Sequence, residues 1–179
     1  DTVSLFDDKL KTTLGVRHQN IKTTSYDPNT QAQTSDYDES KWTPSIGIVY
    51  QPSMDWSVYG NYIESLAKGK PAPLTQNETP VTNGGQELAP YISKQTEVGV
   101  KYDNGMIGSS LAIFHTEEPR AYVDDTNTFV AAGENRHQGA ELSVFGSPSE
   151  NMRIIAGVSY LSAKQKDTGD ISLDGNRVI

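Results

Sequence analysis

Residues 91–103 read Tyr-Ile-Ser-Lys-Gln-Thr-Glu-Val-Gly-Val-Lys-Tyr-Asp, and this stretch decides the fold. Thr96, Val98, Val100 and Tyr102 alternate with a polar or small set, Gln95, Glu97, Gly99 and Lys101. Successive side chains of a β-strand point to opposite faces, so this period of two predicts a strand with one apolar and one polar face. The stretch is also longer than the roughly five or six residues usual for a strand of a globular protein.

The same alternation recurs along the chain and predicts an antiparallel meander of about seven long strands in an all-β fold. The expected strands are Lys9–Tyr26, Trp42–Gln51, Trp56–Ser65, Tyr91–Asp103, Met106–Glu117, Phe129–Gly146 and Met152–Lys164. No segment has a convincing helical pattern. The window Tyr62–Lys68 has some helical propensity, but Gly69 and the prolines after it would stop a helix there.

The connections between these strands are of two kinds. Gln51–Asp55, Asp103–Gly105 and Ser147–Glu150 predict tight turns, whereas Asp27–Lys41 and Ser65–Ala89 are long polar stretches. Short turns at one end and long loops at the other are typical of outer-membrane β-barrels, in which the long loops face the outside.

Aromatic residues lie next to the tight turns: Tyr50 and Trp56 flank one and Tyr102 precedes the next. An aromatic girdle at a membrane boundary would put them there, because amphipathic rings prefer the interface. A soluble sandwich also alternates, and ordinary hairpin aromatics can close a small core. A soluble β-rich ligand-binding or adhesion module therefore remains the alternative.

Composition excludes several classes of protein. Hydrophobic residues make up 35% of the chain, and no apolar run approaches the roughly 20 residues of a spanning helix. A low average is compatible with a barrel, because only alternate residues of each strand face lipid. The net charge of −8 argues against nucleic acid as a partner, since phosphate contact needs a basic patch. The absence of cysteine excludes a disulfide scaffold and a cysteine nucleophile.

Catalytic and metal-binding motifs are also missing from the sequence. His18, His115 and His137 are scattered, without the spacing of a metal site. We find no nucleophile elbow, phosphate-binding loop or dinucleotide fingerprint. We therefore expect a protein that is not an enzyme and has no metal site, no catalytic residue and no covalently bound cofactor.

Residues 88–103, which read L-A-P-Y-I-S-K-Q-T-E-V-G-V-K-Y-D, resemble a strand signature of TonB-dependent siderophore receptors. Leu111–Phe114 and Gly133–Leu142 are similar to the strands that follow in that family, and the latter keeps the pattern G-E-x-R-x-x-G-x-E-L. Trp42–Tyr50 and Trp56–Tyr62 resemble the hairpin that precedes them. Within the family, the resemblance is greatest to the ferrichrome-type hydroxamate receptors.

This resemblance implies a segment of a 22-stranded outer-membrane β-barrel of a Gram-negative bacterium. Residues 1–179 would form part of the C-terminal half of the barrel, with the plug domain and the terminal strands absent. The implied function is TonB-dependent uptake of a ferric siderophore of the ferrichrome type. The implied partners are that ferric siderophore, the plug domain of the full-length chain, TonB and outer-membrane lipid. On its own, such a sheet should associate, fold over on itself or require detergent.

The alternation then divides the candidate residues by location. Glu97, Lys101, Glu141 and Arg153 fall on the polar face and are expected to point into the lumen, toward the plug. The alternative for these four is a hydrated lumen wall with cross-strand charge pairs. Aromatic side chains suit a compact ferric hydroxamate, and the ligand-binding candidates near the loop ends are Trp42, Tyr91, Tyr122 and Phe129.

Two further features of the pattern need an explanation. Gly99, Gly139 and Gly157 lie mid-strand on the polar face, where glycine usually marks a bend or a close approach. Glu134 and Arg136 share the parity of Leu142, so they lie above the membrane or follow a bulge.

Overall fold

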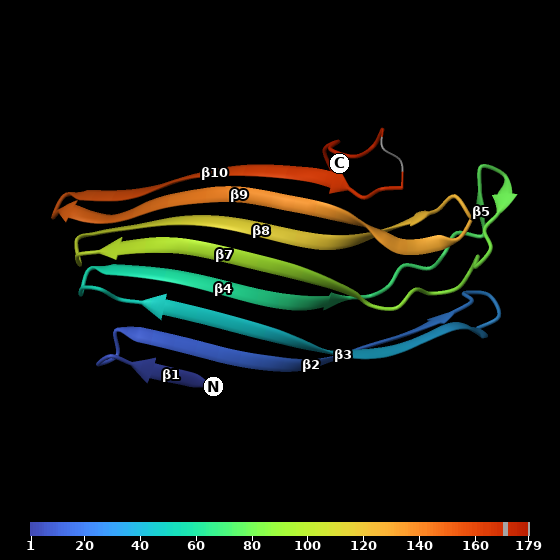
Figure 1. The fold of residues 1–179 in the computed structure, drawn as a ribbon, viewed down its shortest axis with the longest axis horizontal. Helices are drawn as coiled ribbons and strands as arrows, with labels where there is room; N and C mark the ends of the chain where they lie inside the picture. Colours follow the sequence, from blue (N-terminus) through green and yellow to red (C-terminus); the bar gives the residue numbers. More distant parts are fainter. Residues whose placement is uncertain (170–171, 179) are drawn as a thin grey trace.

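The computed structural model describes residues 1–169 and 172–178. In that part of the chain an eight-stranded antiparallel sheet has the order β1-β2-β3-β4-β7-β8-β9-β10, and a two-stranded β5-β6 hairpin lies in a connecting loop (Figure 1). The fold is all-β and a meander, as predicted. The strands are β1 (Thr2–Leu5), β2 (Leu10–Tyr26), β3 (Gln33–Tyr50), β4 (Trp56–Ala67), β5 (Thr75–Gln76), β6 (Thr79–Pro80), β7 (Tyr91–Asp103), β8 (Ile107–Val123), β9 (Phe129–Ser149) and β10 (Met152–Lys166).

The tight turns lie together at one end of the sheet, at the left of Figure 1, as the sequence predicts. In the turn between β7 and β8, Gly105 adopts a φ of 84°, a left-handed conformation that glycine tolerates. The side-chain oxygen of Asn104 accepts hydrogen bonds from the backbone N–H groups of Met106 and Ile107, at 3.0 and 2.9 Å. Local turn chemistry is therefore sufficient to reverse the chain here.

The polar stretch Asp27–Lys41 is not the long loop that the sequence predicts. β3 begins at Gln33, and residues 27–32 alone connect it to β2. Asp38 accepts hydrogen bonds from Asn20 and Lys22 across the strand pair, at 2.8 and 3.1 Å. Such cross-strand pairs stabilise a two-stranded ladder without an apolar face. The hairpin thus continues as extended strand beyond the part of β3 that pairs with β4.

Other boundaries also differ from the sequence prediction. β8 continues to Val123 instead of ending at Glu117, and β9 continues to Ser149, so most of the predicted turn Ser147–Glu150 is strand. An eighth sheet strand, β1, pairs with the start of β2, with Leu5 opposite Leu10. The window Tyr62–Lys68 is not helical, because β4 continues to Ala67 and pairs with β7 along its length. Pairing with a neighbour has overridden a weak local propensity for helix.

The two faces of the sheet differ sharply in chemistry. On one face, which we call the apolar face, the register aligns Val58, Val100, Leu111, Leu142 and Val158 in one row across five strands. Four of these side chains are at least 43% exposed. Near the tight turns the rings of Trp56 and Tyr102 lie 4.9 Å apart on this face. An exposed apolar surface of this extent needs a partner, such as lipid.

The sheet is a single layer without a second sheet against it (Figure 1). A soluble sandwich would bury its apolar face between two layers. Here the buried hydrophobic residues of the described chain all belong to the loop end, namely Tyr37, Ala72, Val81, Tyr91 and Phe129. The described residues contain no helix that is long and apolar enough to cross a membrane.

Candidate functional site

A polar cluster occupies the face of the sheet opposite the apolar face, which we call the polar face. Tyr59, Glu97, Lys101 and Glu141 line a groove of about 500 Å³ there. The Tyr59 hydroxyl donates a hydrogen bond of 2.8 Å to Oε1 of Glu97. Nζ of Lys101 lies 4.9 Å from the centre of the same ring. The cluster presents two carboxylates and one ammonium group to whatever covers the polar face of the sheet.

Three of the four predicted lumen residues are therefore neighbours, and the fourth is not. Glu97, Lys101 and Glu141 line the groove together. Arg153 lies near the tight turn, beside a register shift between Met152 and Ile154. Alternation with Ile155 puts it on the polar face, but it does not line the groove.

The mid-strand glycines of this face have a local explanation in two cases. A Cβ atom on Gly99 would lie 2.5 Å from the ring of Tyr59. A Cβ atom on Gly139 would lie 2.5 Å from the ring of Phe114. Each glycine thus makes room for an aromatic ring from the neighbouring strand, which is the close approach that the sequence left open. Gly157 is different, because a Cβ atom there would meet the carbonyl oxygen of Leu142 at an ordinary 3.5 Å.

A second polar group lies on the polar face nearer the loops, and sequence reasoning missed it. Arg120 donates a short hydrogen bond to Oε1 of Gln165, and Nε2 of His137 lies 3.9 Å from Glu118. The side-chain oxygen of Asn135 is buried and has no hydrogen-bond partner among the described residues. Continuing the alternation of β8 past Glu117 would have placed Glu118 and Arg120 on this face.

The loop of residues 68–90 is fixed at its base by contacts with β3 and β7. The hydroxyl of Tyr37 accepts a hydrogen bond from the backbone N–H of Gly69 at 3.2 Å. Lys68 lies over the Tyr37 ring, 4.9 Å from its centre, and pairs with Glu87 at 3.1 Å. The Tyr91 hydroxyl accepts from the N–H of Lys70 at 3.3 Å, and burial raises the pKa of Tyr91.

The far part of this loop docks on the hairpin between β8 and β9. Asn83 donates a side-chain hydrogen bond to the carbonyl oxygen of Phe129 at 2.9 Å and accepts one from its N–H at 2.8 Å. Phe129 also packs with Ala72 and Val81 in a small buried cluster. Figure 1 shows β5 and the rest of this loop beside the end of the β8–β9 hairpin. The longest loop is thus tied to two parts of the sheet.

The four predicted ligand-binding aromatics have different surroundings. Tyr91 is 7% and Phe129 9% exposed, and both hold the loop of residues 68–90. Trp42 stands opposite His18 with ring centres 4.6 Å apart, on the face that also carries Ile46 and Ile48. Tyr122 follows Arg120 on the polar face and lies against Gly133 and Gly169.

The described residues do not gather three or more histidine or acidic side chains in an arrangement that would hold a metal ion. At the tip of the β8–β9 hairpin, Asp124 accepts hydrogen bonds from the hydroxyl of Thr126 and from backbone N–H groups, including that of Thr128. These hydrogen bonds lower the pKa of the Asp124 carboxyl. Asp124 therefore stabilises the turn at this hairpin tip.

Comparison with known proteins gives consistent results. Residues 1–179 match the family model described as "TonB dependent receptor-like, beta-barrel". The chain is 39% identical over 180 aligned residues to the ferrichrome receptor FcuA of Yersinia enterocolitica, covering 100% of this chain and 24% of that protein. It is 29% identical to the metal-pseudopaline receptor CntO of Pseudomonas aeruginosa, over 89% of this chain and 23% of CntO.

A solved structure has the same fold. The crystal structure of BauA, the ferric preacinetobactin receptor of Acinetobacter baumannii, superimposes with a TM-score of 0.83 at 36% identity. The match covers 99% of this chain and 26% of BauA. The chain therefore spans about a quarter of the length of these relatives.

Proposed function

Because the chain belongs to the TonB-dependent receptor β-barrel family, we propose that it forms a sector of an outer-membrane barrel that imports a ferric siderophore. The sector belongs to the C-terminal half of the barrel, in the outer membrane of a Gram-negative bacterium. The apolar face meets lipid, the polar face lines the lumen, and the loop end faces the outside. The cargo is a ferric siderophore, and uptake depends on TonB.

One observation carries this proposal: a single sheet exposes a continuous apolar face on one side and a charged groove on the other. Alternation of this kind is what a barrel with lipid outside and a polar interior requires. The 39% identity to FcuA extends over the whole chain and supports a ferrichrome-type hydroxamate as the cargo.

On this proposal Glu97, Lys101 and Glu141 contact the plug domain of the full-length chain. Their position in the groove of the polar face supports this. Neighbouring strands also leave their charges only partly neutralised: Glu97 accepts a hydrogen bond from Tyr59, and Glu141 has no ion-pair partner among the described residues. Charged hydrogen bonds with a mobile partner can form and break during transport. Arg153 would contact the plug separately, near the periplasmic turns.

Ligand contacts are proposed for the loop end of the polar face. Among the four aromatic candidates, Tyr122 has the most favourable position, because it shares this face with Arg120 and the unpartnered oxygen of Asn135. An aromatic ring, a cationic donor and an acceptor suit an oxygen-rich chelate. Tyr91 and Phe129 would act on the ligand through the loop that they hold, and Trp42 would contact it only from the outward side of its hairpin.

The test is iron uptake by cells that express the complete reading frame containing this chain. We expect deletion of that frame to abolish accumulation of radiolabelled ferrichrome iron under iron limitation, and expression in trans to restore it. Removal of TonB should abolish accumulation while leaving ferrichrome binding to the cells intact.

Two results would contradict the proposal. Ferrichrome uptake that is unchanged by the deletion would exclude this cargo, and growth on a panel of hydroxamate and catecholate chelates would then identify another. Recovery of the protein in the soluble fraction, rather than with outer membranes on a sucrose gradient, would exclude the barrel sector itself.

A further inference from the structure

Three side-chain amides of the chain precede a glycine, at Asn83–Gly84, Asn104–Gly105 and Gln138–Gly139. This order matters because the backbone nitrogen of a glycine can attack the side-chain carbonyl of the residue before it, with no Cβ atom to hinder the approach. Asparagine is counted among the thermolabile residues for this kind of reaction. The folded chain holds the three dipeptides in different ways, so their reactivity should differ.

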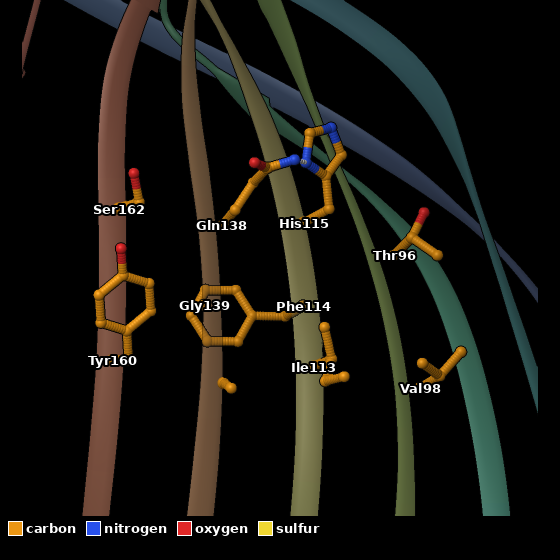
Figure 2. A pocket seen from close by; sticks show the side chains of 10 residues that line it. Thr96, Val98, Ile113, Phe114, His115, Gln138, Gly139, Tyr160 and Ser162 are labelled. Carbon is orange, nitrogen blue, oxygen red and sulfur yellow. Dashed lines mark hydrogen bonds between the residues drawn. The ribbon is translucent and has the colours of Figure 1, made fainter.

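Gln138–Gly139 lies in a regular part of the sheet. The pairing of β8 and β9 has no shift between Glu134 and Gly139, so Glu134 and Arg136 follow no bulge and lie above the apolar rows of their face. Nε2 of Gln138 and Nδ1 of His115 are 2.9 Å apart, and Figure 2 shows these two side chains pointing toward each other. Glutamine must also close a six-membered ring, which is slower than the five-membered ring of asparagine. We therefore expect no reaction at this dipeptide.

Asn83–Gly84 is required by the docking of the loop of residues 68–90. Both functional groups of the Asn83 side chain bond to the backbone of Phe129, at 2.9 and 2.8 Å. A Cβ atom at residue 84 would lie 3.1 Å from Cα of Leu74 and 3.2 Å from its carbonyl oxygen, and these backbone atoms do not move aside easily. Docking thus uses an asparagine followed by a glycine, which is the dipeptide most prone to deamidation.

The same docking protects the dipeptide. The two hydrogen bonds to Phe129 hold the Asn83 amide, so its Cγ atom is not free to turn toward the nitrogen of Gly84. The N–H of Gly84 donates to the carbonyl oxygen of Val81 at 3.0 Å, and it must lose this proton before its nitrogen can attack. Reaction therefore requires this part of the loop to leave the β8–β9 hairpin, as in a local unfolding event.

We propose that Asn83 is a deamidation site that converts undocking of this loop into a permanent change. When the loop undocks, the Gly84 nitrogen attacks Cγ of Asn83 and a ring forms. The amide nitrogen leaves as ammonia, with the proton that the Gly84 nitrogen gave up. Water then opens the ring at either of its carbonyl carbons, which gives aspartate or isoaspartate at residue 83. The reaction consumes one water and needs no oxidant or metal.

Neither product restores the docked state. An aspartate has no N–H to donate to the carbonyl oxygen of Phe129, and it places a carboxylate oxygen against that carbonyl instead. Leaving such a group without its donor is costly. An isoaspartate also adds one carbon atom to the main chain and shifts Gly84 relative to Leu74. The loop therefore stays released after a single reaction.

Asn104–Gly105 is the matched comparison within the same chain. It lies in the tight turn between β7 and β8, at the opposite end of the sheet from the loop (Figure 1). The side-chain oxygen of Asn104 accepts hydrogen bonds from the N–H groups of Met106 and Ile107, and a carboxylate can accept both. Deamidation there should leave the turn intact, and its rate should not depend on docking of the loop.

The first test measures deamidation in the complete receptor, purified in a non-ionic detergent and held in mildly alkaline buffer. Digestion followed by chromatography and mass spectrometry separates asparagine, aspartate and isoaspartate at residue 83. Phe129→Ala should weaken docking, because it removes the ring from the buried cluster with Ala72 and Val81. We expect it to accelerate the loss of Asn83 about tenfold to a hundredfold, with an unchanged rate at Asn104 in the same digests.

Two results of this test would overturn the inference. One is an equal rate at Asn83 in Phe129→Ala and in the unmodified receptor. The other is a rate in the unmodified receptor equal to that of a synthetic peptide of residues 79–88, since docking would then give no protection. If Phe129→Ala loses the heat-dependent gel shift of a folded barrel, or accelerates the reaction at Asn104 equally, Val81→Ala trims the same cluster less and decides the matter in the same way.

The second test measures the consequence of the reaction. Asn83→Asp reproduces the aspartate product, and limited proteolysis within residues 72–87 should accelerate about fivefold to a hundredfold. Asn104→Asp is the matched control at the other Asn-Gly dipeptide and should leave cleavage unchanged. Equal cleavage of Asn83→Asp and the unmodified receptor would show that deamidation does not release the loop. Neither test uses a siderophore, so both decide the inference whatever the cargo is.

Discussion

The ring of Tyr59 lies across Gly99 on the polar face, so close that a Cβ atom on Gly99 would be 2.5 Å from the ring. The two residues are direct cross-strand partners of β4 and β7. This position lets the Tyr59 hydroxyl reach Glu97, at 2.8 Å, and leaves the ring face open to Lys101. The absence of a side chain at Gly99 thus allows the Tyr59 ring to contact both Glu97 and Lys101.

Gly99→Ala should therefore displace the Tyr59 ring and disrupt its hydrogen bond with Glu97. We expect a loss of about 1–3 kcal/mol in the free energy of unfolding, measured by urea titration in lipid vesicles. Gly157→Ala is the matched control on the same face, since its Cβ atom would meet its nearest neighbour at an ordinary 3.5 Å. Equal stability of the two variants would show that the ring moves aside without cost.

Neutralising the groove should impair transport more than binding. In the triple variant Glu97→Gln, Lys101→Met and Glu141→Gln, we expect unchanged affinity for ferrichrome at the cell surface and at least a severalfold lower rate of uptake. The reason is that these side chains line the groove of the polar face, where the proposed function puts the lumen, and lie away from the loop end. Parallel loss of binding and uptake would instead indicate that they contact the ligand or maintain the fold.

Asn83→Ala should release the loop of residues 68–90 from the β8–β9 hairpin. The substitution removes both hydrogen bonds to the backbone of Phe129, which together are worth about 1–3 kcal/mol. Limited proteolysis within residues 72–87 should accelerate about fivefold to a hundredfold. Gln76→Ala, an exposed position in β5, serves as the control and should leave cleavage unchanged. Equal cleavage of both variants would mean that the apolar cluster around Phe129 holds the loop alone.

The hairpin tip between β8 and β9 should loosen in acid. The hydroxyl of Thr126 and the N–H of Thr128 stabilise the charged carboxylate and lower the pKa of Asp124. A group whose folded pKa is depressed contributes its stabilisation above the unfolded value of about 3.9 and loses it as pH falls through the folded value. A pH titration followed by NMR of the carboxyl carbons should give Asp124 a pKa below about 3.9.

Asp124→Asn keeps an oxygen acceptor in the same place but does not titrate. In that variant the titration of residue 124 should disappear. Amide exchange at Thr126 and Thr128 should also lose the acid-induced increase that we expect in the unmodified protein as the pH falls through the pKa of Asp124. A measured pKa for the Asp124 carboxyl at or above about 3.9 would contradict this account.

Much of this fold follows from short-range patterns in the sequence. The strand Tyr91–Asp103 has the predicted bounds, because alternation over that stretch and the Asp-Asn-Gly turn after it are properties of consecutive residues. The tight turns and the apolar and polar faces follow from the same local pattern. The sequence also placed Glu97, Lys101 and Glu141 on one face, since parity along each strand is independent of its neighbours.

Other features depend on which strands become neighbours. Gln33–Lys41 reads as a polar loop, and it is a strand only because β2 supplies partners for Asp36 and Asp38. The docking of Asn83 on Phe129 joins residues far apart in the chain, and no periodicity encodes it. The same is true of Arg136, Lys164 and Arg177, which strand pairing brings side by side on β9, β10 and the segment that follows β10.

By itself, then, the sequence determined the strand type, the two faces and the turns, because a period of two and turn residues act over a few bonds. The tertiary structure alone decided the cross-strand register. Register brings Tyr59 over Gly99, Lys164 between Arg136 and Arg177, and the long loop onto its hairpin. These relationships need hydrogen bonds between separate strands, which are specified by pairing geometry and not by the residues of either strand alone.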